Sequence, residues 1–196
     1  MIARVFFLIL FPSIVFSQSL TTEEEAFFFH KGQIISDSLV VFSNDHVWSY
    51  PLNNLSNPVK RPIDNQMLTF EGEDFQKGIR QFKTLAIDDE FYFVENKGGV
   101  VFKFENDSIK RIDRSFTHRM QIASNLFERD SKIFRFGGYG FWSYRNFFTY
   151  FSADVGEWEV VSPTNSNVFP EGIANALIAL KNDEIILFGG RKQNPN

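Results

Sequence analysis

One short segment, residues 137–146, carries the densest set of side chains suited to ligand binding. It reads GGYGFWSYRN, and its four aromatic residues and one arginine are Tyr139, Phe141, Trp142, Tyr144 and Arg145. Aromatic rings beside a guanidinium suit stacking on a sugar, and the same residue types form hot spots in protein interfaces. For Phe141 and Trp142 the alternative is that both rings fill space between structural units. Tyr139, Tyr144 and Arg145 are expected to be exposed.

Three further residues are candidates for the same binding site. His118 and Arg119 lie in the preceding connection, and Arg191 follows Gly189-Gly190 as Tyr139 follows Gly137-Gly138. Charged residues in loops are often only solvated, so the alternative for each of the three is a surface position without a binding role.

The residue inventory excludes several kinds of chemistry. The chain has no cysteine, and its three histidines, His30, His46 and His118, are far apart, so no thiolate site and no closely spaced metal ligands occur. There is no nucleophile elbow, phosphate loop, dinucleotide fingerprint or catalytically spaced carboxylate pair. The net charge is −4 and no Lys/Arg run is present, which argues against nucleic-acid binding. We therefore expect no cofactor.

The elements that must position these residues form a repeat. Four segments start with an Asp, Asn or Ser turn and continue as a short apolar run, and they end at Phe42, Val94, Phe136 and Phe188. The separations are 52, 42 and 52 residues. Repeats of about 40–50 residues are typical of propellers.

The second unit shows four expected strands joined by tight turns. Asp88-Asp89, Asn106-Asp107 and a Gly98-Gly99 turn with positive φ separate strands at Phe82–Ile87, Phe91–Glu95, Val100–Glu105 and Ser108–Asp113. The third unit repeats this pattern near Gln121–Phe127, Lys132–Phe136, Phe147–Ser152 and Glu157–Ser162. Four short antiparallel strands make one propeller blade. The 25 phenylalanines fit sheets that are covered on both faces.

The third unit resembles the kelch repeat. Ile133–Phe136 runs into Gly137-Gly138, Phe151 follows thirteen residues after the second glycine, and Trp158 comes seven residues later. The kelch pattern is an apolar strand, two glycines, an aromatic residue and a tryptophan. The resemblance implies that the glycines turn the chain sharply and that Phe151 and Trp158 pack between blades. It also implies that segment 137–146 lies on the end where ligands and partners commonly bind.

The other units match the kelch pattern to different degrees. Ile185–Phe188 followed by Gly189-Gly190 resembles it again. The first unit turns at Asn44-Asp45 without a glycine pair. The second has Gly98-Gly99, whose first glycine comes four residues after the apolar run ends at Val94, and neither unit has the late tryptophan. The alternative fold is another antiparallel sandwich with glycine-rich turns.

The predicted fold is all-β: a β-propeller of four-stranded antiparallel blades over residues 18–196. Only six residues follow Gly189-Gly190, so the fourth unit has two of its strands and the propeller is incomplete, with about three and a half blades. Because closed propellers have about 4–8 blades, we expect the remaining blades to come from a longer chain.

The N-terminus has the pattern of a signal peptide over residues 1–17. Arg4 precedes an apolar stretch from Val5 to Phe16, and small or polar residues lead to an expected cleavage before Gln18. The stretch is shorter than the ~20 residues that span a bilayer, so the alternative of a retained anchor is less favoured and no span is expected in the mature chain. Export without cysteine fits a bacterial periplasmic, cell-surface or secreted protein.

Three functions are compatible with these patterns. The favoured one is an exported, non-catalytic propeller module that binds a protein or a glycan. The second is a periplasmic carbohydrate-active enzyme, since kelch propellers include a sialic-acid mutarotase. The third is the sensory ectodomain of a longer membrane receptor. The fold alone does not separate them.

Overall fold

The computed structural model describes residues 30–69, 78–114, 121–161, 170–182 and 184–192. Within these ranges the regular structure is β-strand, with two short 3-10 turns, η2 (Gln66–Leu68) and η3 (Ile79–Gln81). The all-β prediction is therefore confirmed. The predicted signal peptide lies outside the described residues. No helix in the described ranges is long and apolar enough to cross a membrane.

The first blade is a four-stranded antiparallel sheet. Its strands follow one another in order: β1 (Lys31–Ile35), β2 (Ser38–Phe42), β3 (His46–Pro51) and β4 (Val59–Pro62). Each strand pairs with the next along the chain, as expected for strands joined by short connections.

The second blade has the same order, with one strand added at its outer edge. It contains β6 (Phe82–Ile87), β7 (Glu90–Glu95), β8 (Val101–Glu105) and β9 (Ser108–Arg111). The short β5 (Asp64–Asn65), from the connection after the first blade, pairs in parallel with β9. This added strand ties the first blade's exit to the second blade, and the repeat pattern did not predict it.

The third blade carries an extra hairpin. Its sheet is formed by β10 (Asn125–Arg129), β11 (Lys132–Phe136), β14 (Phe148–Ser152) and β15 (Glu157–Val160). The connection between β11 and β14 contains β12 (Tyr139–Gly140) and β13 (Ser143–Tyr144), which pair with each other. The first strand starts later than predicted because Ile122, upstream of it, bridges to Tyr139. A last hairpin, β16 (Leu177–Lys181) and β17 (Glu184–Phe188), begins the fourth unit.

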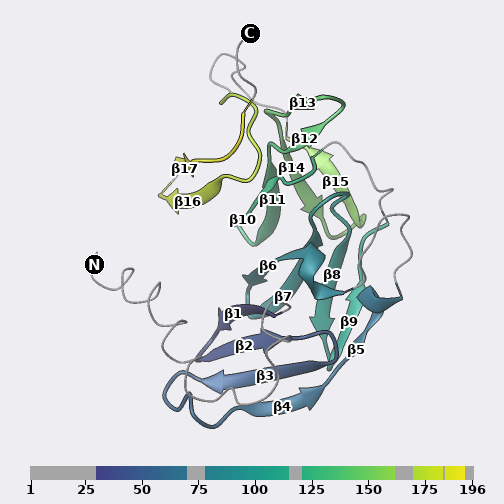
Figure 1. Cartoon of the computed structure of the whole chain (residues 1–196), viewed down its shortest axis with the longest axis vertical. Coiled ribbons are helices and arrows are strands. Elements are labelled where there is room, and N and C mark those ends of the chain that lie inside the picture. The colour runs from purple at the N-terminus through teal and green to yellow at the C-terminus, as the bar shows by residue number, and fades with distance from the viewer. Residues whose placement is uncertain (1–29, 70–77, 115–120, 162–169, 183, 193–196) are drawn as a thin grey trace.

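The units are arranged as a fan around a common centre. The first strand of each unit lies next to the first strand of the following unit, from β1 to β6, β10 and β16. The fourth strands β4, β9 and β15 lie on the outer side, as Figure 1 shows. Side-chain bonds tie the inner strands together: Gln33 Nε2 donates to the Thr84 carbonyl at 3.1 Å, and Lys83 Nζ donates to the Ser124 carbonyl at 2.6 Å. This is the geometry of propeller blades.

The core lies between the blades, where the phenylalanines gather. Phe42 of the first blade packs against Phe91 of the second with ring centroids 4.4 Å apart, and both side chains are fully buried. Between the second and third blades, Phe151 packs against Trp158 at 5.6 Å in a cluster with Val94 and Val101. The predicted position of the aromatic–tryptophan pair between blades is therefore confirmed.

The turn residues have the conformations that tight hairpins need. Asp88-Asp89 and Asn106-Asp107 all have φ between 48° and 64°, as two-residue hairpin turns require. Gly137-Gly138 and Gly189-Gly190 also have positive φ in both residues. For Gly98-Gly99 the prediction was half wrong, because only Gly99 has positive φ, at 81°.

Candidate functional site

The aromatic segment forms a hairpin that stands out from the end of the third blade. Tyr139 pairs with Tyr144 across β12 and β13, and their rings lie 5.2 Å apart in an edge-to-face arrangement. The two residues between the strands, Phe141 and Trp142, have φ of 48° and 63°. They form the tip of the hairpin.

Glycine allows the hairpin to approach the neighbouring connections closely. The Gly138 N–H donates to the Ile173 carbonyl at 2.7 Å, and the Tyr139 N–H donates to the Ile122 carbonyl, also at 2.7 Å. A Cβ at Gly138 would lie 2.6 Å from the Gln121 carbonyl carbon, so no larger residue fits this approach. The pair of glycines thus brings three loop segments together.

These segments border an open pocket of about 470 Å³, a volume within the usual range for small-ligand sites. Its walls are two aromatic rings of the hairpin strands, the tip tryptophan, and residues of the two inter-blade connections: Tyr139, Tyr144, Trp142, Ile122, Ala123, Ala174, Asn175 and Arg191. The pocket therefore lies between the ends of the third and fourth units.

Four of the seven predicted binding residues meet in this pocket. They are Tyr139, Trp142, Tyr144 and Arg191. Arg145 is not in the pocket wall; its guanidinium carbon lies 5.7 Å from the centre of the Phe141 ring. His118 and Arg119 fall outside the described residues.

The exposures differ from the sequence expectations. Phe141 is 72% exposed and Trp142 is 88% exposed, so the interpretation that these rings fill space between blades is wrong. Tyr139, Tyr144 and Arg145 were expected to be exposed but are half-buried, and the Arg145 Nε atom is buried without a hydrogen-bond partner. The difference arises because the tyrosines lie on the hairpin strands, against the connections, whereas Phe141 and Trp142 occupy the turn.

Sequence reasoning missed the pocket residues that come from the inter-blade connections. Ala123 and Asn175 hold equivalent places in the third and fourth units, with φ of 57° and 53°. The Asn175 N–H donates to the Ala123 carbonyl at 2.9 Å, which links the two units at the pocket wall. Their spacing of 52 residues is the same as that between Tyr139 and Arg191, so extending the repeat alignment into the connections could have found them.

The polar side chains of the pocket wall come from four residues. The wall offers the guanidinium of Arg191, the amide of Asn175 and two tyrosine hydroxyls, and none of its described residues is a carboxylate or a histidine. No group of three potential metal-ligating side chains occurs among the residues that the structure describes. Lys83, whose Nζ bonds to the Ser124 carbonyl beside the wall, has a lowered pKa because it is desolvated and because Lys31 repels its charge.

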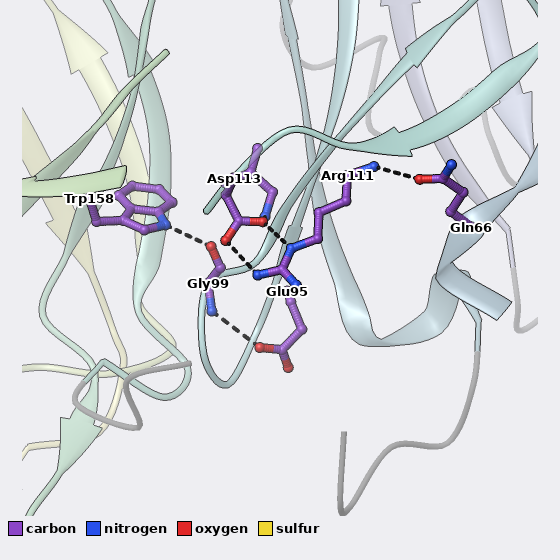
Figure 2. Close-up of polar contacts among 7 residues, drawn as sticks. Gln66, Glu95, Gly99, Arg111, Asp113 and Trp158 are labelled. Carbon is purple, nitrogen blue, oxygen red and sulfur yellow. Dashed lines mark hydrogen bonds and ion pairs between the residues drawn. The ribbon is translucent and has the colours of Figure 1, made fainter. Parts of the chain in front are cut away.

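A buried polar cluster fixes the third blade on the second. The Trp158 indole N–H donates to the Gly99 carbonyl at 2.7 Å (Figure 2). The buried Glu95 carboxylate accepts the backbone N–H groups of Lys97, Gly98 and Gly99. These bonds hold the loop between β7 and β8 in the shape that receives the tryptophan.

Charged side chains complete this cluster. Asp113, also in Figure 2, accepts the Arg111 Nε–H at 2.8 Å and the Val101 N–H at 3.1 Å. The Arg135 guanidinium stacks 3.8 Å from the centre of the Trp158 ring. Burial lowers the pKa of Arg135, and two carboxylates nearby oppose that shift. We interpret this cluster as support for the blade interface, because its contacts join the two blades and none of its residues lines the pocket.

Comparison with known proteins bears on the fold. No protein-family model matches the chain, and no curated protein sequence matches it. A solved structure described as "Structure of YjhT" matches with a TM-score of 0.53 and 12% identity, over 82% of this chain and 58% of that one. The fold is a kelch-like β-propeller. The chain thus spans little more than half the length of this structural neighbour, and the identity is low enough that the likeness concerns the fold alone.

Proposed function

We propose that the protein is an exported, non-catalytic propeller module that binds a carbohydrate in the pocket between the third and fourth units. The observation that carries the proposal is the wall itself, where Trp142, Tyr139 and Tyr144 stand beside the polar ends of Asn175 and Arg191. The signal-peptide pattern of residues 1–17 supports export to a periplasmic, cell-surface or secreted location.

This wall suits the two kinds of surface that a sugar presents. The C–H face of a sugar ring is apolar and packs on an aromatic ring, and the exposed indole of Trp142 offers such a ring. The hydroxyl groups at the sugar's edge need hydrogen-bond partners, which Asn175, Arg191 and the tyrosine hydroxyls can supply. Polar groups placed beside apolar surface are the usual arrangement for orienting a small ligand.

The same wall favours binding over catalysis. General acid–base catalysis uses a positioned histidine, carboxylate, lysine, cysteine or tyrosine with a suitable pKa. Of these side-chain types the described wall supplies only two tyrosines, Tyr139 and Tyr144, which pair with each other across the hairpin, and no histidine, carboxylate, lysine or cysteine. We therefore propose a binding role and treat conversion of the bound sugar as the outcome that would contradict it.

The test is titration of the full chain with a panel of neutral, amino and acidic monosaccharides, followed by ligand-detected NMR. We expect at least one sugar to bind, and Trp142→Gly to weaken that binding about tenfold, because stacking on the indole is lost. Glycine accepts the φ of 63° at this position, so the turn is kept.

Phe141→Asn is the matched control for this titration. It changes the adjacent exposed ring, which is not part of the pocket wall, and monosaccharide binding is expected to stay within twofold of wild type. Absence of binding by every sugar, or equal binding by Trp142→Gly and wild type, would refute the proposed function. Catalysed exchange between the anomers of a bound sugar, seen in the same spectra, would refute the non-catalytic role.

A further inference from the structure

The turn at the hairpin tip is built from residues that such turns disfavour. Among the described non-glycine residues with positive φ, Phe141 and Trp142 are the only aromatic ones. The corresponding two-residue turns elsewhere in the chain use short polar side chains: Asp88-Asp89, Asn106-Asp107 and Asp130-Ser131. Within the described ranges the chain therefore makes the same turn several times and uses aromatic residues for it only at the hairpin tip.

Physical chemistry gives the fold no reason for this departure. A left-handed backbone brings Cβ close to the following carbonyl oxygen, which is why glycine, asparagine and aspartate dominate these positions. Both rings also project into solvent, with 72% and 88% of Phe141 and Trp142 exposed, so little packing compensates for the strain. Strained residues that do not serve the fold point to function.

The two rings do not serve the same surface. Trp142 forms part of the pocket wall, whereas Phe141 does not. Phe141 lies beside the Arg145 guanidinium, with 5.7 Å between the guanidinium carbon and the ring centre. An exposed aromatic ring beside a cation thus stands directly outside the pocket, one residue away from the pocket's own tryptophan.

We propose that Phe141 and Arg145 form a second subsite, and that the ligand is an oligosaccharide which extends from the pocket across the hairpin tip. This inference rests on the proposed function, because the pocket must first hold one sugar unit. The next sugar unit can then stack on the Phe141 ring, and its hydroxyl oxygens can accept hydrogen bonds from the Arg145 guanidinium.

The surroundings of the tip favour a sugar chain over a lipid surface. The pocket wall beside the tip carries a guanidinium, an amide and two tyrosine hydroxyls, from Arg191, Asn175, Tyr139 and Tyr144. Inserting these groups among lipid chains would remove their hydrogen-bond partners, which is costly, whereas sugar hydroxyls replace those partners. The apolar part of the tip is limited to two rings, which is the size of a stacking surface for successive sugars.

Titration with oligosaccharides of increasing length tests the subsite. The probes are glucose, N-acetylglucosamine and galacturonate, each as the monomer and as linear chains of two, three and four units. We expect wild type to bind the trimer of at least one series about tenfold more tightly than its monomer. Phe141→Asn should abolish that gain while leaving monomer binding unchanged, and Trp142→Gly should weaken both.

The outcomes separate this inference from the proposed function. If a monomer binds through Trp142 but the longer chains bind no more tightly, or if Phe141→Asn keeps the full gain, the second subsite is wrong and the pocket assignment stands. If no saccharide binds, the proposed function itself fails. Sedimentation with phosphatidylethanolamine–phosphatidylglycerol vesicles that depends on Phe141 and Trp142 would overturn the choice of a sugar chain. Equal thermal unfolding midpoints or higher ones in the variants would show that they are folded.

Discussion

Replacing the hairpin tip by the residues that its backbone prefers should make the protein more stable. The double variant Phe141→Asn, Trp142→Gly keeps the turn, because both new residues accept φ of 48° and 63°. Relief of the left-handed strain stabilises the folded state by roughly 1–2 kcal/mol per residue. The flexibility of glycine in the unfolded chain reduces this gain by about 1 kcal/mol. Little packing is lost, since both rings are largely exposed. The expected net gain is about 1–3 kcal/mol.

The assay is urea unfolding followed by circular dichroism and by the fluorescence of the remaining tryptophans, Trp48 and Trp158. The unfolding midpoint should rise while the slope with denaturant stays the same, and the thermal midpoint should rise by about 2–12 °C. The control is Asp130→Asn, Ser131→Gly, a turn with φ of 51° and 56° whose native residues are short and polar. Its stability should change by less than about 0.5 kcal/mol.

A loss of stability in the double tip variant would refute the reasoning, because it would mean that the rings stabilise the fold. A gain in stability together with loss of saccharide binding would show that the native tip sacrifices stability for function.

Two further predictions concern the interface between the second and third blades and an ion pair within the second blade. Gly99→Ala should lower the free energy of unfolding by about 3 kcal/mol, because φ is 81° and the new Cβ would lie 1.9 Å from Arg135 Nη1. The control Gly189→Ala, with φ of 65° and open space around the new Cβ, should lower it by about 1 kcal/mol. Equal losses of stability in urea unfolding would contradict the packing argument. The hydrogen bond from Lys103 lowers the pKa of Glu90 below 4.5, so the stabilisation from Glu90 is fully present above pH 4.5 and is lost as the pH falls through the folded-state pKa. Because Glu90 is partly exposed, its contribution to stability should stay below about 1 kcal/mol. A Glu90→Gln variant should therefore lose less stability than wild type between pH 5 and 3. Parallel curves of unfolding free energy against pH for the two proteins would show that the Glu90–Lys103 pair does not contribute.

Much of the fold could be predicted from the sequence because the repeat is local. Turn residues such as Asp88-Asp89 and Asn106-Asp107 determine where strands end, and the apolar runs between them determine the strands. The glycine pair before the hairpin, Phe151 and Trp158 all belong to one unit, so the sequence of that unit is enough to predict which residues pack between blades. The short strand β5 was missed, since its two residues carry no periodic pattern and only their pairing with β9 makes them a strand.

For the candidate site, too, the sequence predicts some features and the tertiary structure decides others. Sequence alone could name Tyr139, Trp142, Tyr144 and Arg191, because residue type and the repeat alignment are properties of the chain. Only the tertiary structure decided that these four share one pocket with Asn175, since hydrogen bonds between successive units bring those connections together.

Exposure was likewise decided in three dimensions. Trp142 and Tyr144 are two residues apart and equally aromatic, yet one projects into solvent and the other is half-buried. The reason is that a left-handed turn directs the side chain of Trp142 away from the sheet, while the strand at Tyr144 lays its ring against Tyr139. The sequence thus determined which side chains the candidate site has, and the paths of the turn and of the neighbouring connections determined which of them line the pocket.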